Sequence, residues 1–552
     1  GSQNPFEERD IISSVLDIPN SKLNVVVPAI GGSFGGKCEA DLSVLAALAA
    51  WLCKAKVRMV NSREESMVGH TKRHPAIMKY KIGAKEDGTI VALSANILLD
   101  SGAYAPVGPS VGAIVAEIGC GPYRIPNVNM VTRVIYTNSP PSGTIRSAGG
   151  SQAVYGIERM IDILADKLSI DPVAIRNKNI WAKGDITSFG VRINDKPPLE
   201  ECLEHASLAC EKLRKIPAGP GKICGVGVAT SLLKMGLGYR IADDSTNCVE
   251  WKSDGNVVVH LGAPDLGQGL TTVAAQVTSE MLGIDYEQIE IKQLDTSTSP
   301  NGGPTITSRT TFLVGNSLID ACNDAIKVLL QFASEVLDIP KEDLSYQNGF
   351  VIINQTQKVK EIPVKYFAAK AREDNCHLIG QATSSFPYPE DTPDKYRPGM
   401  PHVMFIYGAQ VARVEIDPEF GHITVTDIVS IHDVGKAINP KSIEGQIEGG
   451  VAMGIGYALY EDMKIKPNGS WTDNFLEYIM PTIIDMPNIT SVILENKEKQ
   501  GPFGAVGLGE SVTVATAPAI VNAVRDATGI QFSEIPLDPC KVIENLYSKN
   551  MP

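Results

Sequence analysis

Residues 23–37 read LNVVVPAIGGSFGGK and are followed by an alanine- and leucine-rich stretch. The run Leu23–Ile30 is rich in β-branched residues and predicts a short strand, Gly31–Lys37 predicts a tight loop, and Asp41–Lys54 predicts a helix. A glycine loop between a strand and a helix can point backbone N–H groups at an anionic or oxo group. The alternative is an ordinary turn between a strand and a helix.

Turn signals elsewhere indicate antiparallel hairpins. Asp87-Gly88 lies between the alternating runs of Met78–Leu99, Asp254-Gly255 repeats this pattern, and Phe420-Gly421 is a looser version of it. Hairpins mixed with helices favour an α+β fold over a doubly wound parallel sheet. Apolar periodicity predicts further helices at Ser151–Leu168, Leu199–Lys215, Leu270–Leu282, Leu313–Leu337, Ser442–Tyr460 and Val512–Thr528.

The chain length allows more than one large compact unit. It has 552 residues, and the Pro- and Gly-rich segment Ile216–Lys222 (IPAGPGK) precedes a new strand-rich region. Domain boundaries fall in such segments. We therefore predict two large domains, residues 1–219 and residues 220–552, which are similar in kind but carry no fixed-period repeat.

Composition excludes several classes of protein. Hydrophobic residues make up 43% and charged residues 20%, which excludes intrinsic disorder. The net charge of −13 argues against nucleic acid and anionic membranes as partners, and no apolar run is long enough to span a bilayer. None of the ten cysteines forms a C-x-x-C pair, so zinc ribbons and iron–sulfur ligation are not expected. Their low density favours a reducing compartment, and we expect a cytoplasmic protein.

The glycine loop Gly31–Lys37 matches the G-x-x-x-x-G-K pattern of nucleotide-binding phosphate loops. The next residue is Cys38, where such a loop needs the hydroxyl of a Ser or Thr to hold magnesium. A thiol is a poor ligand for a hard cation. A nucleotide hydrolase is therefore the weaker interpretation.

Four other loops share a glycine-rich, polar character. Pro264–Gly269 and Gly445–Gly450 each place a Gln beside glycines, Gly303–Thr311 gathers hydroxyls around one Arg, and Gly501–Ser511 carries the single carboxylate Glu510. Glycines let a ligand approach the backbone, and Gln amides suit a heterocycle whose edge both donates and accepts. Each loop alone could be a simple turn. Five such loops in one chain predict a large polar cofactor that is enclosed on many sides.

Seven motifs together resemble a known family. They are SQNPF (Ser2–Phe6), GGSFGGK, PPSGTIRSAGGSQ (Pro140–Gln152), DLGQG, TSRTT (Thr307–Thr311), GQIEGG and GAVGLGES (Gly504–Ser511). In this order they resemble the molybdenum-binding catalytic subunit of the xanthine oxidase family of molybdenum hydroxylases, from Gln3 to at least Asn522. The resemblance implies two large elongated mixed α/β domains that hold a molybdopterin cofactor between them. Family members also carry a segment before the first motif, which we expect on a separate chain.

The resemblance implies a role for each matching residue. Glu510 corresponds to the catalytic carboxylate, and Gln3 corresponds to the glutamine that bonds an oxo ligand of molybdenum. Arg146, Cys38 and Phe34 fall at substrate-binding positions. Residues at cofactor-binding positions are Gly35, Gly267, Gln268, Gly269, Ser308, Arg309, Thr310, Thr311, Gln446, Gly507 and Gly509. No side chain is expected to ligate the metal, because the pterin dithiolene holds it.

The substrate position combines features of different relatives. Purine-oxidising relatives have a Glu where Cys38 stands, whereas aldehyde-oxidising relatives generally lose the arginine that is present here as Arg146. Relatives that oxidise carbon monoxide have a Cys where Ser147 stands. We therefore expect oxidative hydroxylation of an N-heteroaromatic substrate, such as a purine or a nicotinate-like ring, with oxygen from water. An aldehyde substrate is the alternative within the family.

The family's electrons leave through partner subunits. This chain has no iron–sulfur spacing and no dinucleotide fingerprint, so the resemblance implies [2Fe–2S] clusters and FAD on partner chains. We expect a dimer of the hetero-complex, and the pterin could carry a cytosine dinucleotide. Interpretations from other classes are a non-catalytic cofactor-binding scaffold and the nucleotide-binding protein. The scaffold is disfavoured because it would need neither Gln3 nor Glu510.

Overall fold

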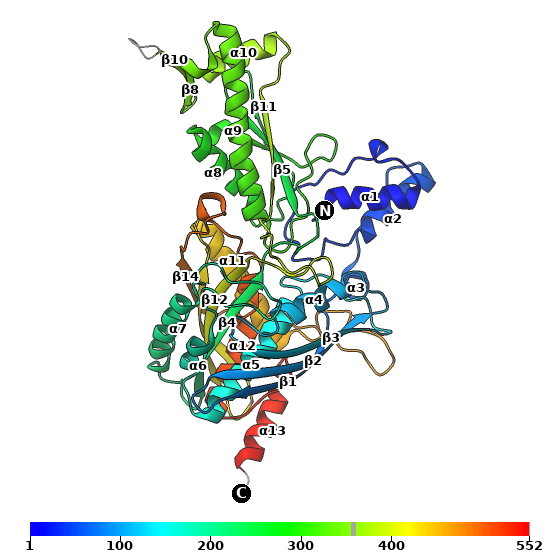
Figure 1. The fold of residues 1–552 in the computed structure, drawn as a ribbon. Helices are drawn as coiled ribbons and strands as arrows, with labels where there is room; N and C mark the ends of the chain where they lie inside the picture. The colour runs from blue at the N-terminus through cyan, green and yellow to red at the C-terminus, as the bar shows by residue number, and fades with distance from the viewer. Residues whose placement is uncertain (355–359, 551–552) are drawn as a thin grey trace.

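The structure is a computed structural model that describes residues 1–354 and 360–550. The molecule is elongated, with a lobe at one end, a larger body at the other and an N-terminal arm at the side (Figure 1). The mixture of helices and mixed sheets confirms the expected α+β fold. Within the described residues no helix is both long and apolar enough to cross a membrane.

The body is built on two sheets. A three-stranded sheet has the order β1-β2-β3, and a four-stranded sheet has the order β14-β13-β12-β4. The strands are β1 (Ala76–Ala84), β2 (Ile90–Gly102), β3 (Asn127–Tyr136), β4 (Ile223–Lys234), β12 (Phe405–Ile416), β13 (Ile423–Asp433) and β14 (Asn488–Leu494). The helices of the body are α3 (Arg63–Gly69), α4 (Gly108–Ile118), α5 (Gly150–Leu168), α6 (Pro172–Asn179), α7 (Leu199–Arg214), α11 (Pro440–Ile455), α12 (Thr516–Thr528) and α13 (Pro539–Asn550).

The second lobe is formed from residues 244–354 and 360–385. Its larger sheet has the order β11-β5-β6-β7, and its smaller sheet has the order β10-β9-β8. The strands are β5 (Asp244–Trp251), β6 (Val257–His260), β7 (Ile289–Lys292), β8 (Leu344–Gln347), β9 (Phe350–Ile353), β10 (Lys360–Pro363) and β11 (Ile379–Ser385). The helices are α8 (Leu270–Leu282), α9 (Thr310–Leu337) and α10 (Val364–Glu373), and α9 runs along the length of the lobe (Figure 1).

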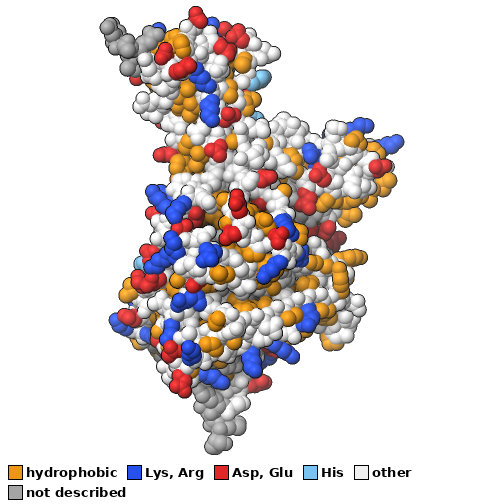
Figure 2. Space-filling view, viewed as in Figure 1, with side chains coloured by type: hydrophobic (Ala, Val, Ile, Leu, Met, Phe, Trp, Pro, Cys, Tyr) orange, Lys and Arg blue, Asp and Glu red, His pale blue; other side chains and the backbone are white. Residues whose placement is uncertain are grey.

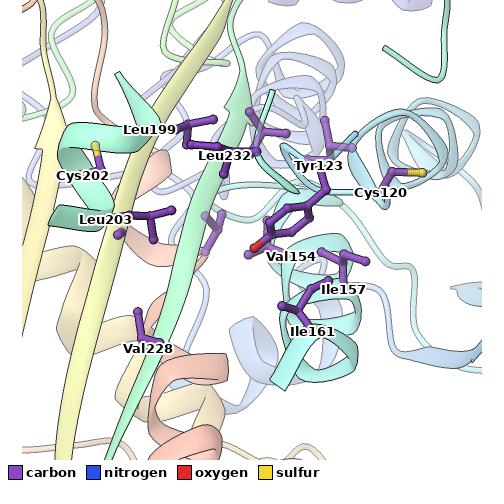
Figure 3. Packing of buried hydrophobic residues seen from close by; sticks show 14 of the residues in the cluster. Cys120, Tyr123, Val154, Ile157, Ile161, Leu199, Cys202, Leu203, Val228 and Leu232 are labelled. Atoms are coloured by element: carbon purple, nitrogen blue, oxygen red, sulfur yellow. The ribbon is translucent and has the colours of Figure 1, made fainter. Parts of the chain in front are cut away.

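The main hydrophobic core of the body lies between β4 and the helices that precede it in the chain. Val154, Ile157 and Ile161 of α5 and Leu199 and Leu203 of α7 pack around this strand (Figure 3). This core includes residues from both sides of residue 219, so one packed layer crosses the predicted division of the chain. The boundary at 219/220 stays a prediction.

Helix α12 covers the other face of β4 at close range. A Cβ on Gly227 would lie 2.2 Å from the backbone N of Ala523, so only glycine allows the helix to approach this strand. The helix belongs to a second core that also contains α11 and one face of β12 and β13. This packing fixes β4, α11 and α12 relative to one another.

The N-terminal arm consists of α1 (Pro5–Leu16) and α2 (Asp41–Cys53). Helix α2 forms as predicted, but none of its residues is buried, and Leu45, Trp51 and Leu52 are exposed. Apolar side chains gather on this arm in Figure 2. The predicted strand Leu23–Ile30 is wrong, because only an isolated bridge between Val26 and Asp295 forms there, and Pro28 has no N–H to donate to a ladder.

The other predicted helices and hairpins are confirmed, with two adjustments. The predicted helix Ser442–Tyr460 is α11 followed by a π-helical turn at Gly456–Tyr460. The predicted helix Val512–Thr528 is a 3₁₀ turn at Ser511–Thr513 followed by α12. The hairpin turns at Asp87-Gly88, Asp254-Gly255 and Phe420-Gly421 all join antiparallel strands.

Candidate active site

A cavity of about 480 Å³ lies where the two lobes and the start of the chain meet. Its wall contains parts of all five glycine-rich segments named above, together with the start of α9. Four of these segments are loops, but Gly445–Gly450, which we expected to be a loop, lies within α11 and contributes one face of that helix. Its volume lies in the range of small-molecule and cofactor sites. The fold therefore brings together segments that are hundreds of positions apart in the sequence.

Most of the predicted site residues line this cavity. They are Gln3, Phe34, Gly35, Arg146, Gly267, Gln268, Ser308, Thr310, Thr311, Gln446, Gly507, Gly509 and Glu510. The structure does not bring Cys38, Gly269 and Arg309 to the wall.

Gln3 is fixed by bonds to two of the loops. Its Nε2 donates to the carbonyl of Thr305 at 2.9 Å, and its Oε1 accepts from the backbone N–H of Lys37 at 3.2 Å and from the hydroxyl of Ser33. The residue is only 3% exposed. Gln3 therefore joins the start of the chain, the Gly31–Lys37 loop and the loop before α9.

The Gly31–Lys37 loop depends on left-handed backbone conformations. Phe34 has φ +55° and Gly35 has φ +101°, and a Cβ on Gly35 would lie 2.3 Å from the carbonyl oxygen of Thr144. Only glycine fits there, so the loop packs tightly against the segment that carries Arg146. Lys37 bonds the carbonyl of Gly32 in its own loop, which argues against the nucleotide-binding interpretation because a phosphate-binding lysine must reach out to its ligand.

Arg146 links three parts of the site. Its Nε donates to the carbonyl of Gly509 at 2.6 Å, and its Nη2 donates to the backbone and side-chain oxygens of Gln446 at 3.2 and 3.1 Å. The Phe34 ring lies 5.9 Å from the guanidinium. Burial lowers the pKa of Arg146 to about 10, and the Glu510 carboxylate opposes this shift, so the guanidinium is charged at neutral pH. Among the described residues, its Nη1 makes one hydrogen bond, a 4.0 Å contact with the sulfur of Met453, which leaves its second hydrogen for a ligand.

Glu510 lines the cavity from the loop between β14 and α12. Among the described residues its carboxylate makes no hydrogen bond. The buried amine of Lys234, at the end of β4, interacts electrostatically with Glu510. Burial lowers the pKa of Lys234, whereas Glu510, Glu117 and Asp243 raise it. The carboxylate is thus open to the cavity and lies near the charged guanidinium of Arg146 and the buried amine of Lys234.

Arg309 has a structural position instead of a ligand-facing one. Its fully buried side chain forms an ion pair with Asp243 (Nε to Oδ1, 2.5 Å) and donates to the carbonyls of Gly302, Pro304 and Asp244 at 2.6–2.9 Å. These bonds use all its nitrogens and turn the guanidinium away from the cavity. Arg309 therefore holds the loop in shape from behind.

Cys38 and Gly269 also lie behind the cavity wall. Burial and the neighbouring Glu39 raise the pKa of the Cys38 thiol far above its usual range, so the thiol stays protonated. A protonated thiol is a poor nucleophile. Gly269 has φ +92° at the start of α8, and its N–H donates to Asp265 at 3.2 Å. It therefore shapes the turn into the helix.

Several wall residues were missed by reasoning from the sequence. Asn439, Ser442 and Ile443 line the cavity together with Gln446 from one face of α11. Their spacing of i, i+3, i+4 and i+7 is that of one helical face, so this periodicity was the available signal. Thr307 lies within a loop that the sequence singles out, but only the structure shows that it faces the cavity.

Comparisons with known proteins agree with this architecture. Two models of the molybdopterin cofactor-binding domain match the chain, at residues 1–180 and 201–487. A probable xanthine dehydrogenase subunit of Bacillus subtilis (strain 168) is 31% identical over 100% of this chain and 72% of its own length. This chain belongs to the molybdenum hydroxylase family. The gamma subunit of the 6-hydroxypseudooxynicotine dehydrogenase complex of Paenarthrobacter nicotinovorans is 28% identical over 100% of this hydroxylase chain and 70% of its own length.

Solved structures of molybdenum hydroxylases have the same fold. Quinoline 2-oxidoreductase from Pseudomonas putida 86 superposes with a TM-score of 0.86 at 25% identity, over 100% of this chain and 72% of its own. Aldehyde oxidoreductase from Desulfovibrio gigas gives a TM-score of 0.85 at 28% identity, over 99% of this chain and 57% of its own.

The cavity residues of this hydroxylase fit a molybdopterin. Nε2 of Gln268 and Oγ1 of Thr307 are buried and have no hydrogen-bond partner within the described parts of the chain, although both residues line the cavity. A buried polar atom without a partner costs about 1–3 kcal/mol, so a polar ligand would relieve both. Amides and hydroxyls suit a pterin edge, which both donates and accepts hydrogen bonds. The chain is a molybdenum-dependent oxidoreductase that binds a molybdopterin cofactor.

Proposed function

We propose that this chain is the catalytic subunit of a hydroxylase for N-heteroaromatic substrates, with Glu510 as its general base. The observation that carries the proposal is the position of the Glu510 carboxylate, which faces the cofactor cavity without a protein hydrogen-bond partner among the described residues. A general base must be free to reach the proton that it accepts. A scaffold that only stores cofactor would not need such a group.

The bound cofactor would supply the redox chemistry. The chain's own residues would bind, orient and move a proton. Gln268, Gln446 and the hydroxyls of Ser308, Thr310 and Thr311 line the wall that would hold the pterin, and Gln3 would bond an oxo ligand of the metal. Glu510 would accept the proton that is released as the substrate carbon gains its oxygen.

The wall favours a flat, electron-poor ring. Phe34 is 57% exposed beside the guanidinium of Arg146, so an aromatic surface lies next to a cation. One N–H of this cation has no partner among the described residues. Arg146 could pair a carboxylate or stabilise negative charge on a ring atom. Relatives include a nicotine 6-hydroxylase and quinoline 2-oxidoreductase, which supports a ring substrate. Aldehyde oxidoreductases are also among the relatives, so an aldehyde is the second candidate.

Electrons would leave through partner chains with [2Fe–2S] clusters and FAD. A complex is named for one relative, the 6-hydroxypseudooxynicotine dehydrogenase, which supports a hetero-oligomer. We also propose the division into domains 1–219 and 220–552, a dimer of the complex, a cytosine dinucleotide form of the pterin, and a cytoplasmic location.

Substitution of Glu510 tests the proposal. With hypoxanthine, nicotine, quinoline and benzaldehyde as probes and a dye as electron acceptor, Glu510→Gln should keep its molybdenum content but lower turnover by about 10²–10⁴-fold, because a positioned base contributes a factor of that size. Glu342→Gln, an exposed site at the far end of the second lobe, is the matched control. Unchanged turnover in Glu510→Gln would refute the assignment.

The substrate class is tested separately with Arg146→Met. Loss of the guanidinium should lower turnover of the ring probes more than turnover of benzaldehyde. If the order of the four substrates stays the same, the proposed role of Arg146 is wrong.

A further inference from the structure

Ser147, next to Arg146, has an unusual backbone conformation for a serine. It is 1% exposed and has φ +64°, in the left-handed region. A residue with a Cβ is about 1–2 kcal/mol less stable there than in the right-handed region. Such strain persists only where surrounding contacts hold it, and it is concentrated at functional sites. Ser147 does not line the cavity, so its strain is not explained by contact with a ligand.

The Ser147 hydroxyl contacts the backbone of the proposed base. Its Oγ donates to the carbonyl of Glu510 at 2.5 Å and lies 2.5 Å from Oγ1 of Thr513, which in turn lies 3.0 Å from the same carbonyl. The two hydroxyls have two hydrogens for these three contacts. However the hydrogens are distributed, at least one of the two hydroxyls donates to the Glu510 carbonyl. The left-handed backbone of Ser147 places its hydroxyl for these contacts.

Both ends of Glu510 are held in this way. Its backbone N–H donates to the Ser308 hydroxyl at 3.2 Å, and Ser308 itself has φ +52°. The preceding carbonyl, of Gly509, accepts from Arg146. Side chains from two distant segments therefore restrain the peptide groups on either side of the carboxylate.

Ser147 is itself held from behind. Arg73, in the segment before β1, donates through Nη2 to the carbonyl of Arg146 at 2.7 Å and through Nη1 to the carbonyl of Ser147 at 3.4 Å. Its guanidinium also bonds the Tyr457 hydroxyl at 2.6 Å, in the π-helical turn that follows α11. Arg73 thus keeps the Arg146–Ser147 backbone in the conformation that aims the Ser147 hydroxyl at Glu510.

We propose that Ser147 is a positioning residue that, together with Thr513, sets the direction of the Glu510 carboxylate toward the cavity. The inference rests on the proposed role of Glu510 as the base. The direction of a side chain depends on the φ and ψ of its own residue. The hydrogen bonds to the Glu510 carbonyl restrain ψ of Glu510 and therefore the direction of its carboxylate. Proton transfer requires close alignment, and a displacement of about 1 Å can lower a rate by about 10²-fold. Loss of the Ser147 hydroxyl should therefore affect catalysis more than folding.

The test uses the holoenzyme complex and the probe with the highest turnover. Ser147→Gly removes the hydroxyl, which costs about 0.5–1.5 kcal/mol per lost hydrogen bond, but it also relieves about 1–2 kcal/mol of left-handed strain, so the variant should be about as stable as the parent. We expect kcat to fall by about 10- to 100-fold, with KM within about twofold and molybdenum content unchanged. Thr513→Val should lower kcat in the same way. Thr513→Ser, which keeps the hydroxyl, should keep the kcat of the parent. A crystal structure of Ser147→Gly should show the Glu510 carbonyl and carboxylate displaced.

The matched control is Ser169→Gly. Ser169 is exposed at the end of α5 and has φ +53°, so this substitution relieves the same kind of strain far from Glu510. It should raise stability and leave kcat unchanged. Wild-type kcat in Ser147→Gly, or a loss of kcat that is matched by loss of molybdenum or of thermal stability, would overturn the proposal. Glu510→Gln, assayed in parallel, separates the two ideas: an active Glu510→Gln refutes the base, whereas an inactive Glu510→Gln beside a normal Ser147→Gly refutes only the positioning role.

Discussion

Substitution of His432 by leucine should make the unfolding free energy of this chain less sensitive to acid. His432 lies on β13 with no exposed surface, and neither ring nitrogen has a hydrogen-bond partner within the described residues. Its ring fills the space above Gly408, where a Cβ would lie 2.5 Å from Nδ1. Burial lowers the pKa of His432 from 6.5 to about 3.

The sign and size of the effect follow from proton linkage. The unfolded chain binds a proton on this histidine below pH 6.5, but the folded chain does not until about pH 3, so stability falls as the pH falls through this window. Below pH 6.5 each pH unit lowers the free energy of unfolding by about 1.4 kcal/mol, and above pH 6.5 the effect is small. About 1.5 such units separate pH 6.5 from pH 5, so the loss between pH 7.5 and pH 5 is about 2 kcal/mol. A leucine of similar volume cannot bind a proton, and this part of the loss should disappear.

Urea unfolding of both proteins at pH 7.5, 6 and 5 measures the difference. The parent should lose about 2 kcal/mol more than His432→Leu over this range. His422→Gln, at the exposed turn between β12 and β13, is the control and should follow the parent. Parallel pH profiles for the parent and His432→Leu would show that the folded chain protonates this histidine normally, and the reasoning would fail.

Two further predictions concern the loops around the cavity. Arg309→Met should lower the free energy of unfolding by about 3–5 kcal/mol, because it leaves Asp243 buried without its ion pair, and an unchanged urea midpoint would contradict this. Gly507→Ala should lose molybdenum on purification while the chain stays folded, because the new Cβ would lie 1.9 Å from the carbonyl oxygen of Ser308 and must displace the wall. Gly445→Ala, whose Cβ would meet nothing within 4 Å, should retain the metal.

Local signals predicted the elements whose stability is local. The Asp-Gly turns set their hairpins because their conformation needs a left-handed residue, and the apolar period of Leu270–Leu282 matched α8 at both ends. The strand predicted for Leu23–Ile30 does not form, because a strand needs a neighbouring strand to pair with. The composition of the run does not show whether such a neighbour is present. Helix α2 formed as expected, but its exposure depends on what packs against it.

The motifs alone determined the family, the type of cofactor and a set of residues that includes most of the cavity wall, because glycines, amides and hydroxyls in fixed order record how a backbone must approach a ligand. Only the tertiary structure decided which of these side chains face the ligand. Gln268 and Arg309 both lie in such loops, yet Gln268 lines the cavity with an amide nitrogen that has no partner among the described residues, whereas Arg309 turns away to Asp243, 66 positions earlier in the chain. The direction of a loop side chain depends on backbone dihedral angles and on partners brought close by folding, and neither is encoded by nearby residues.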